Sequence, residues 1–161
     1  MNLNKKISLE VFDEQDEVTY YTVLCDGEAN SETIKFFSNF INKDNFKEDI
    51  DIISKRIDKI GSNGAEDRHF RREGTPRDDV GALPDNFYSS KLRLYAIHVS
   101  KNIVILGNGG HKTTKTYNND PFLNDCVTLL QAIDKKLKNN LKYGKIKINN
   151  RKLVGTTTFN I

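Results

Sequence analysis

The segment from residue 91 to residue 106 constrains the fold most, because two strand patterns follow each other with only a short turn between them. Residues 91–99 (KLRLYAIHV) alternate, which places Leu92, Leu94 and Ala96 on one face of a strand and Lys91, Arg93 and Tyr95 on the other. After the turn, the run IVIL (103–106) is apolar on both faces, as in a central strand. The segment therefore predicts an antiparallel hairpin at the centre of a sheet.

Two helices are predicted before this hairpin and one after it. The first covers ETIKFFSNFIN, residues 32–42, behind Ser31 as N-cap. The second shows the clearest stripe, and Gly61 is expected at its C-terminal cap; the stripe consists of Phe46, Ile50, Ile53, Ile57 and Ile60. The third begins with Asp120 as N-cap and Pro121 as first residue. Its predicted buried stripe is Leu123, Val127, Leu130, Ile133 or Asp134, and Leu137.

Further strands are predicted near both ends of the chain. ISLEVF (7–12) and VTYYTVL (18–24) flank an acidic turn, and residues 144–159 form a second hairpin about Asn149 and Asn150. Residues 61–90 hold four of the ten glycines and two of the three prolines and are predicted as mostly loop, with HFRRE (69–73) as a short hidden strand. Helices and strands cluster rather than alternate, so the predicted class is α+β, with an antiparallel sheet in a single domain, 1–161.

The glycine-rich stretch after the apolar strand, GNGG (107–110), raises the question of a phosphate-binding loop. Such a loop ends in Gly-Lys-Ser/Thr, whereas His111 precedes Lys112 here, and a dinucleotide fingerprint needs a glycine where Lys112 stands. The next predicted helix also starts too far away to offer its N-terminus to a phosphate. We therefore expect no nucleotide cofactor, and expect the glycines to end the central strand in a sharp bend that presents His111, Lys112 and Lys115 beyond the sheet.

Charge is distributed unevenly along the chain, although the net charge is only +3. Residues 1–60 carry 8 Lys and Arg against 13 Asp and Glu, whereas residues 61–161 carry 17 against 9. This segregation favours an acidic partner for the second part, with RNA or DNA first. No apolar run is long enough for a membrane span, and the N-terminus lacks the apolar core of a secretory signal. We expect a cytoplasmic protein without metal, in which Cys25 and Cys126 are buried, reduced thiols.

The order of these elements resembles the RelE/ParE superfamily of bacterial toxins, including HigB and phage-encoded relatives. The resemblance covers roughly residues 46–137 and rests on ALPDNFYSSKLRLY (82–95), LRLYAIHVSKNIVILGNGGHKTTKTY (92–117) and NDPFLNDCVTLLQAI (119–133). In that family two helices precede an arginine-bearing strand, an apolar strand, a Lys/Thr-rich segment and a final helix. On this basis residues 31–137 are the toxin-like core, and residues 1–26 and 140–161 are added hairpins.

The resemblance implies one component of a toxin–antitoxin system: a metal-independent endoribonuclease that acts on mRNA, generally on the ribosome, and is covered by a small antitoxin protein. Metal-free cleavage needs a base, an acid and cations around the phosphorane. The guanidinium of Arg93 suits the phosphate, and His111 or Tyr95 suits proton transfer. The predicted RNA-binding residues are Lys91, Lys112, Lys115, Arg71 and Arg72.

Simpler interpretations of the same residues stay open. Arg93 and Tyr95 are also what an exposed sheet face carries, and Arg93 can pair with Glu73 or Asp79. His98 shares the face of the strand leucines, which is typical of a hydrogen-bonded core histidine. The alternative function is a non-catalytic protein- or nucleic-acid-binding module on the same fold, as in ParE-like toxins that bind gyrase.

Overall fold

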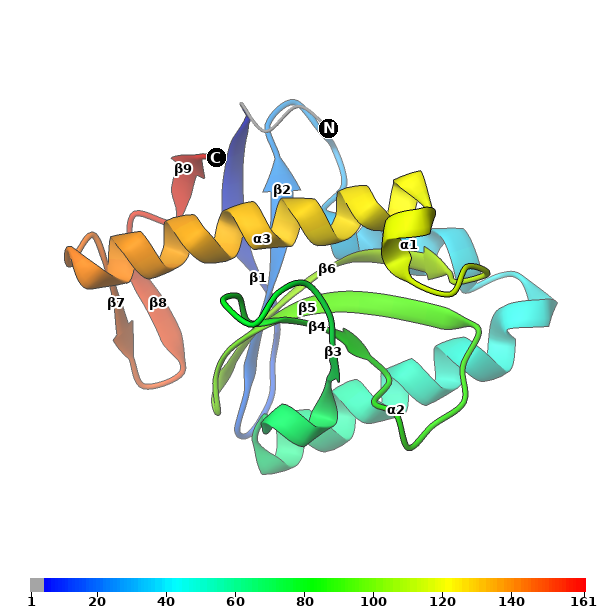
Figure 1. The fold of residues 1–161 in the computed structure, drawn as a ribbon. Coiled ribbons are helices and arrows are strands. Elements are labelled where there is room, and N and C mark those ends of the chain that lie inside the picture. The colour runs from blue at the N-terminus through cyan, green and yellow to red at the C-terminus, as the bar shows by residue number, and fades with distance from the viewer. Residues whose placement is uncertain (1–4) are drawn as a thin grey trace.

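The computed structural model describes residues 5–161, which form one seven-stranded sheet, a separate two-stranded ribbon and three α-helices (Figure 1). The strands are β1 (Lys6–Glu14), β2 (Thr19–Cys25), β3 (Arg71–Arg72), β4 (Val80–Leu83), β5 (Leu92–Ser100), β6 (Ile103–His111), β7 (Ile146–Asn149), β8 (Lys152–Gly155) and β9 (Thr158–Asn160). The helices are α1 (Glu32–Phe40), α2 (Lys47–Asn63) and α3 (Pro121–Lys142), with short 3-10 turns η1 (Asp44–Phe46), η2 (Asp67–His69) and η3 (Tyr117–Asn119). The predicted α+β class is confirmed.

The strand order in the main sheet is β3-β4-β5-β6-β2-β1-β9. Every pairing is antiparallel except that of β2 with β6, where residues 19–22 lie parallel to residues 103–106. Between β2 and β6 the chain forms α1, α2 and strands β3–β5, so this parallel pair is joined by a long connection and not by a tight turn. The β1–β2 hairpin is thus continuous with the sheet, whereas β7 and β8 pair only with each other.

Helices cover both faces of the sheet. α3 crosses one face, and α1 and α2 pack on the opposite one (Figure 1). β5 divides its side chains between the two cores as predicted, since Tyr95 and Ile97 lie in the α3 core and Leu92, Leu94 and Ala96 in the other. The alternative of an exposed sheet face does not hold at Tyr95, because this side chain is completely buried in the α3 core (0% exposed).

The helix termini follow the predicted capping signals with one exception. The side chain of Ser31 accepts a hydrogen bond from the Ile34 amide, and that of Asp120 accepts one from the Leu123 amide, which satisfies amides that have no partner within the helix. Gly61 does not end α2: the helix continues to Asn63, and Gly64 follows with a φ of 98°. Gly61 is instead buried against Gln15, whose side chain occupies the space that a Cβ would need.

β6 does not end at the glycines, which corrects the expectation of a bend at residues 107–110. The strand continues to His111, with Gly109 opposite Leu94 and Gly110 opposite Arg93, after an irregular step in the pairing on either side of Tyr95. A Cβ on Gly109 would lie 1.8 Å from the Arg93 carbonyl oxygen. The glycines therefore let two strands and α3 approach closely, rather than ending a strand.

The segment from residue 61 to residue 90 contains more structure than predicted. Residues 71 and 72 within HFRRE form β3, as expected, but β4 was not predicted, because its sequence VGAL is short and lacks alternation. The C-terminal hairpin is confirmed as β7 and β8, and β9 then pairs with β1 at the sheet edge. Within the described residues no helix is long and apolar enough to cross a membrane.

Candidate active site

Polar side chains gather on the α3 face of the sheet, at the end of β5 that lies beside the start of α3. Alternation along β5 turns Arg93 and Tyr95 toward this face. Glu73 follows β3 and is held by a hydrogen bond from its amide to the Val80 carbonyl (3.2 Å). η3 adds Tyr117, whose ring centre lies 6.4 Å from that of Tyr95. The Glu73 cluster, as we call it, consists of Glu73, Arg93, Tyr95, Lys112 and Tyr117.

Arg93 is half-buried within this cluster and only partly hydrogen-bonded. Its Nη1 donates to the carbonyl oxygens of Ser90 (2.6 Å) and Leu92 (3.0 Å), whereas its Nε is buried without a partner. Burial lowers the pKa of the guanidinium, and the nearby charge of Arg71 lowers it further. The Nε–H group of this cation has no acceptor among the described residues, and a buried charged donor without an acceptor lowers the stability of the folded state. An anion bound at this position would therefore be favoured.

Glu73 is half-buried beside three cations. Burial raises the pKa of its carboxyl above the ordinary value, while the charges of Lys112, Arg93 and Arg71 act in the opposite direction. The net result is a carboxyl that keeps its proton to a higher pH than a solvated glutamate does. Carboxyl groups shifted toward neutral pH can take up and release protons during a reaction, which is the property of a general base or acid.

The two tyrosines of the cluster hold their protons strongly. Burial raises the pKa of Tyr95, and the charge of Glu73 adds to the effect. The Tyr95 hydroxyl is buried without a hydrogen-bond partner, so it does not meet solvent. Tyr117 is half-buried, and burial followed by the charges of Glu73 and Asp78 raises its pKa. Of the two, Tyr117 has the more accessible side chain.

The structure does not bring His111 together with Arg93 and Tyr95. His111 is paired with Leu92 and therefore belongs to the opposite face, where its ring packs edge-on against Phe46 with 5.1 Å between centres. Lys91 lies on the same side, with its Nζ 5.9 Å from the centre of the Phe46 ring and 3.4 Å from the Asn45 carbonyl. Both side chains are exposed at the sheet end that also carries the cluster.

The other predicted RNA-binding residues fall into two groups. Lys112 is half-buried and acts on Glu73, and its Nζ donates to the Lys115 carbonyl (3.1 Å), which places both lysines beside the cluster. Arg71 and Arg72 instead bind their own chain. Arg71 donates to three acceptors of the 84–88 loop, and Arg72 donates to the turn at residues 75–78; the acceptors are Pro84 O, Asn86 Oδ1, Tyr88 O, Thr75 O and Asp78 O.

The remaining titratable groups have structural surroundings. His98 contacts Asp67 Oδ1 through Nδ1 (3.0 Å) and Ala65 O through Nε2 (3.1 Å), so it is hydrogen-bonded as predicted. Asp79 pairs with Lys138 (3.1 Å) and not with Arg93. Both thiols are buried, and burial raises the pKa of Cys126 to about 12 and also raises that of Cys25.

One group of residues within 5–161 has the ligand spacing of a metal site: Cys25, Glu28 and Glu32. Lys35 forms ion pairs with both glutamates of this group, at 2.8 Å from Glu32. The ammonium group thus already supplies positive charge to the position where a cation would bind. This arrangement fits a surface ion-pair network better than a metal site.

No protein-family model, curated protein or solved structure matches this chain. The fold and the candidate site therefore define the class from geometry: an α+β protein in which a half-buried arginine and a half-buried carboxyl lie near each other at one end of a sheet that is covered on both faces. Sequence reasoning missed Glu73 and Tyr117 as site residues. The signal for Glu73 was its place two residues after Arg71 in the predicted hidden strand, which puts both on one face.

Proposed function

We propose that this protein is a toxin-like endoribonuclease of the RelE/ParE type, which cleaves mRNA without a metal ion and is held inactive by a small antitoxin. The observation that carries this proposal is that Arg93, whose buried Nε has no acceptor, lies near enough to the half-buried Glu73 carboxyl for its charge to act on the carboxyl, whose pKa burial raises. A phosphodiester would supply the missing acceptor, and a ribose 2′-hydroxyl would supply the proton for Glu73. The order α1, α2, β4–β6, Lys/Thr-rich segment, α3 supports the resemblance.

The chemistry assigns a role to each member of the cluster. Ionised Glu73 takes the proton of the 2′-hydroxyl, O2′ forms a bond to phosphorus, and the bond from phosphorus to O5′ breaks. Tyr117 donates its proton to the leaving O5′, and the products are a 2′,3′-cyclic phosphate and a 5′-hydroxyl. Arg93 and Lys112 stabilise the charge of the phosphorane. Tyr95 is fully buried and its hydroxyl has no hydrogen-bond partner within residues 5–161, so it takes no part in proton transfer; its ring packs against that of Tyr117.

Basic side chains surround the cluster and suit the flanking phosphates. The Lys112 amide donates to the Lys91 carbonyl (2.9 Å), and Arg93 lies opposite Gly110, so Lys91, His111 and Lys112 share one end of the β5–β6 pair. In this proposal Lys91, Lys112 and Lys115 bind RNA backbone, and His111 contributes from the opposite face of the sheet. Arg71 and Arg72 support the surrounding loops.

The test is production of the protein alone in a bacterium, followed by mapping of RNA ends. We expect growth arrest and new 5′-hydroxyl ends, both lost in Glu73→Gln and in Arg93→Ala, while Glu10→Gln, an exposed carboxyl on β1, behaves as wild type. Purified protein should cut RNA in the presence of EDTA. Normal growth and intact transcripts with soluble, folded protein would contradict the proposal.

A non-catalytic binding module is the second candidate, and the complete burial of Tyr95 under α3 favours it. The two functions separate in a double variant, Arg93→Ala with His111→Ala. Growth inhibition that persists in this variant indicates binding to a protein or nucleic acid without cleavage. Loss of inhibition in a folded variant indicates catalysis.

A further inference from the structure

A pocket lies on the α2 side of the molecule, away from the α3 face. Its volume is about 470 Å³, which lies within the range of roughly 300–1,000 Å³ that is usual for small-ligand sites. α2, η2 and the loop after β4 form its walls. We call it the Phe87 pocket; its lining residues are Arg56, Lys59, Asn63, Arg68, His69, Asp85, Phe87 and Tyr88.

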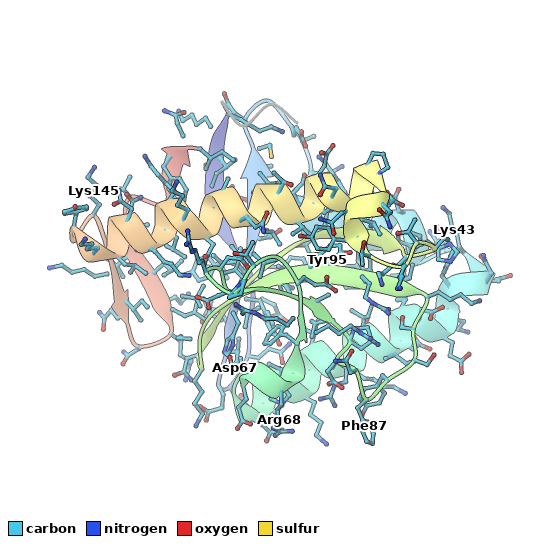
Figure 2. All side chains as sticks on the ribbon, viewed as in Figure 1. Lys43, Asp67, Arg68, Phe87, Tyr95 and Lys145 are labelled. Carbon is cyan, nitrogen blue, oxygen red and sulfur yellow. The ribbon has the colours of Figure 1, made fainter. Side chains whose placement is uncertain are left out.

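An exposed aromatic ring stands at the edge of this pocket. Phe87 is 88% exposed, which is unusual for a phenylalanine, and it packs edge-on against Tyr88 with 5.4 Å between ring centres. Figure 2 shows Phe87 and Arg68 at the same edge of the molecule, far from Tyr95. Arg71 holds the loop backbone on either side of Phe87 by donating to the carbonyls of Pro84 (2.8 Å) and Tyr88 (2.7 Å).

The pocket is positively charged. Arg56 pairs with Asp85 (3.4 Å), the only acidic lining residue, and lies over the Tyr88 ring at 4.9 Å, yet its Nε is buried without a partner. Lys59 is exposed, and the described residues offer it no ion pair. Arg68 is 73% exposed and pairs with Glu66 through Nε only. Arg56 and Arg68 each have one carboxylate partner, and Lys59 remains, in the described part of the chain, as the cation without one, so the net positive charge of the pocket favours an anionic ligand.

His69 adds an imidazole whose tautomer is fixed by a hydrogen bond. Its Nδ1 accepts a hydrogen bond from the Glu66 amide (2.9 Å), so the ring proton of the neutral imidazole is on Nε2. Burial lowers the pKa of His69, and the charges of Arg68 and Arg56 lower it further, which keeps the ring neutral. The pocket thus combines an aromatic surface, cations and a neutral N–H donor.

We infer that the Phe87 pocket binds one nucleotide of a single-stranded nucleic acid, with the base stacked on Phe87 and the adjacent phosphates on Lys59 and Arg68. Planar stacking surfaces beside cations are the arrangement that single-stranded nucleic acids require. The site lies apart from the Glu73 cluster and is not needed for the chemistry there. It would hold a length of strand on the α2 side, and its existence does not depend on cleavage.

The absence of tryptophan from the chain allows a direct test. Phe87→Trp introduces a single indole at the pocket, and a DNA decamer of thymidines, which has no 2′-hydroxyl and cannot be cleaved by the proposed route, serves as the probe. We expect base stacking to quench the indole fluorescence. An abasic decamer, which keeps the phosphates, should quench little. Equal responses to both oligonucleotides, or no response to either, would overturn the inference.

Affinity measurements on a labelled decamer give the second readout. Phe87→Ala should weaken binding about tenfold or more, the loss expected when one stacked base is removed. Lys59→Ala with Arg68→Ala should also weaken it and reduce its salt dependence, whereas Lys55→Ala, an exposed lysine of α2 outside the pocket, should not. Unchanged affinity in folded Phe87→Ala would refute the site.

The two proposals fail separately. Glu73→Gln should bind the thymidine decamer in the Phe87 pocket as tightly as the wild type does. If Glu73→Gln still cleaves RNA while Phe87→Ala loses affinity, the cleavage site is misplaced and the pocket stands. If Phe87→Ala binds normally while Glu73→Gln loses cleavage, the pocket is refuted and the cleavage site stands.

Discussion

At Glu73, burial and neighbouring charge act on one carboxyl in opposite directions. Burial raises its pKa, and Lys112, Arg93 and Arg71 limit that rise. A glutamate in water is fully ionised at neutral pH and is a weak base, so partial burial improves it as a base. The same cations stabilise the ionised carboxylate and so offset part of the free-energy cost of burying its charge.

The pH dependence of cleavage should report this carboxyl. The base must be ionised, so the rate should rise with pH through the raised pKa of Glu73 and level off above it. In Glu73→Gln the rate should fall by about 10²-fold or more, and this rising limb should disappear. The check is a series of single-turnover rates across pH on a short RNA. A rising limb that persists in Glu73→Gln would assign it to another group.

The same carboxyl should affect folding stability in the opposite sense. The folded state binds the proton more tightly than the unfolded state, so stability is highest below the unfolded pKa and decreases as pH rises to the folded pKa. Glu73→Gln should therefore raise the melting temperature at neutral pH and not at acidic pH. Glu10→Gln is the matched exposed control, for which no such difference is expected.

The site residues differ in how far the sequence alone could find them. Arg93 and Tyr95 were placed on the correct strand face, because alternation in residues 91–99 is strong. The sequence could not show that His111 lies on the opposite face, since this depends on an irregular step in the pairing of β5 with β6. Glu73 joins the cluster only through the β3–β4 pairing, and a two-residue strand carries almost no periodic signal.

At the scale of the element, β6 shows why glycines occur in the middle of a sheet. Gly107 faces Leu130 of α3, with 3.0 Å between the position of a Cβ and the nearest side-chain atom, and Gly109 faces the backbone of β5. The first contact brings α3 close to the sheet, and the second permits the irregular pairing beside Tyr95. The sequence GNGG thus encodes close packing, which local sequence patterns do not distinguish from a turn.

Gly109→Ala should destabilise the protein by about 1–3 kcal/mol or more, because the added Cβ would lie 1.8 Å from a backbone oxygen that cannot move alone. Gly110→Ala is the matched change, since its nearest contact is 3.3 Å from a Leu123 side-chain carbon that can shift, and it should cost less than about 1 kcal/mol. Urea unfolding of both variants makes the comparison. Equal losses would mean that strand proximity at Gly109 is unimportant.

The helices were the most predictable elements. Ser31 and Asp120 cap α1 and α3 as expected, and all the stripe residues of α2 and α3 are buried. Gly61 misled the prediction of the α2 terminus, because a glycine that makes space for Gln15 resembles a capping glycine in sequence. Tertiary packing, and not local preference, determines the last turn of this helix.

At the scale of the whole molecule, helices on both faces leave the ends and edges of the sheet as the places where polar groups can gather. The Glu73 cluster lies at one such end, beside the Lys/Thr-rich segment that follows β6. The surplus of basic residues after residue 60 gives this part of the chain a positive electrostatic potential. Binding of an acidic partner should therefore depend on salt.

Replacement of both Lys112 and Lys115 with alanine should weaken RNA binding and reduce its salt dependence. Each lost contact with a single strand lowers the log–log slope by about 0.7, so the pair should lower it by about 1.4. Stability should change by less than about 1 kcal/mol, because these lysines are at least partly exposed. Titration of labelled RNA at several salt concentrations gives the slope. A variant with unchanged slope would place the bound strand elsewhere.

The parallel contact between β2 and β6 joins residues 19–22 to residues 103–106. During synthesis the β1–β2 hairpin and both early helices leave the ribosome long before the strand that lies beside β2, and the apolar stripe of α2 has no complete sheet beneath it until then. The N-terminal elements therefore cannot complete the centre of the sheet before β6 is made. Pairing of β2 with β6 also closes a long loop, which makes this pairing slow. A nascent chain shorter than about a hundred residues should need a chaperone, and the time in which it can aggregate is determined by the arrival of β6.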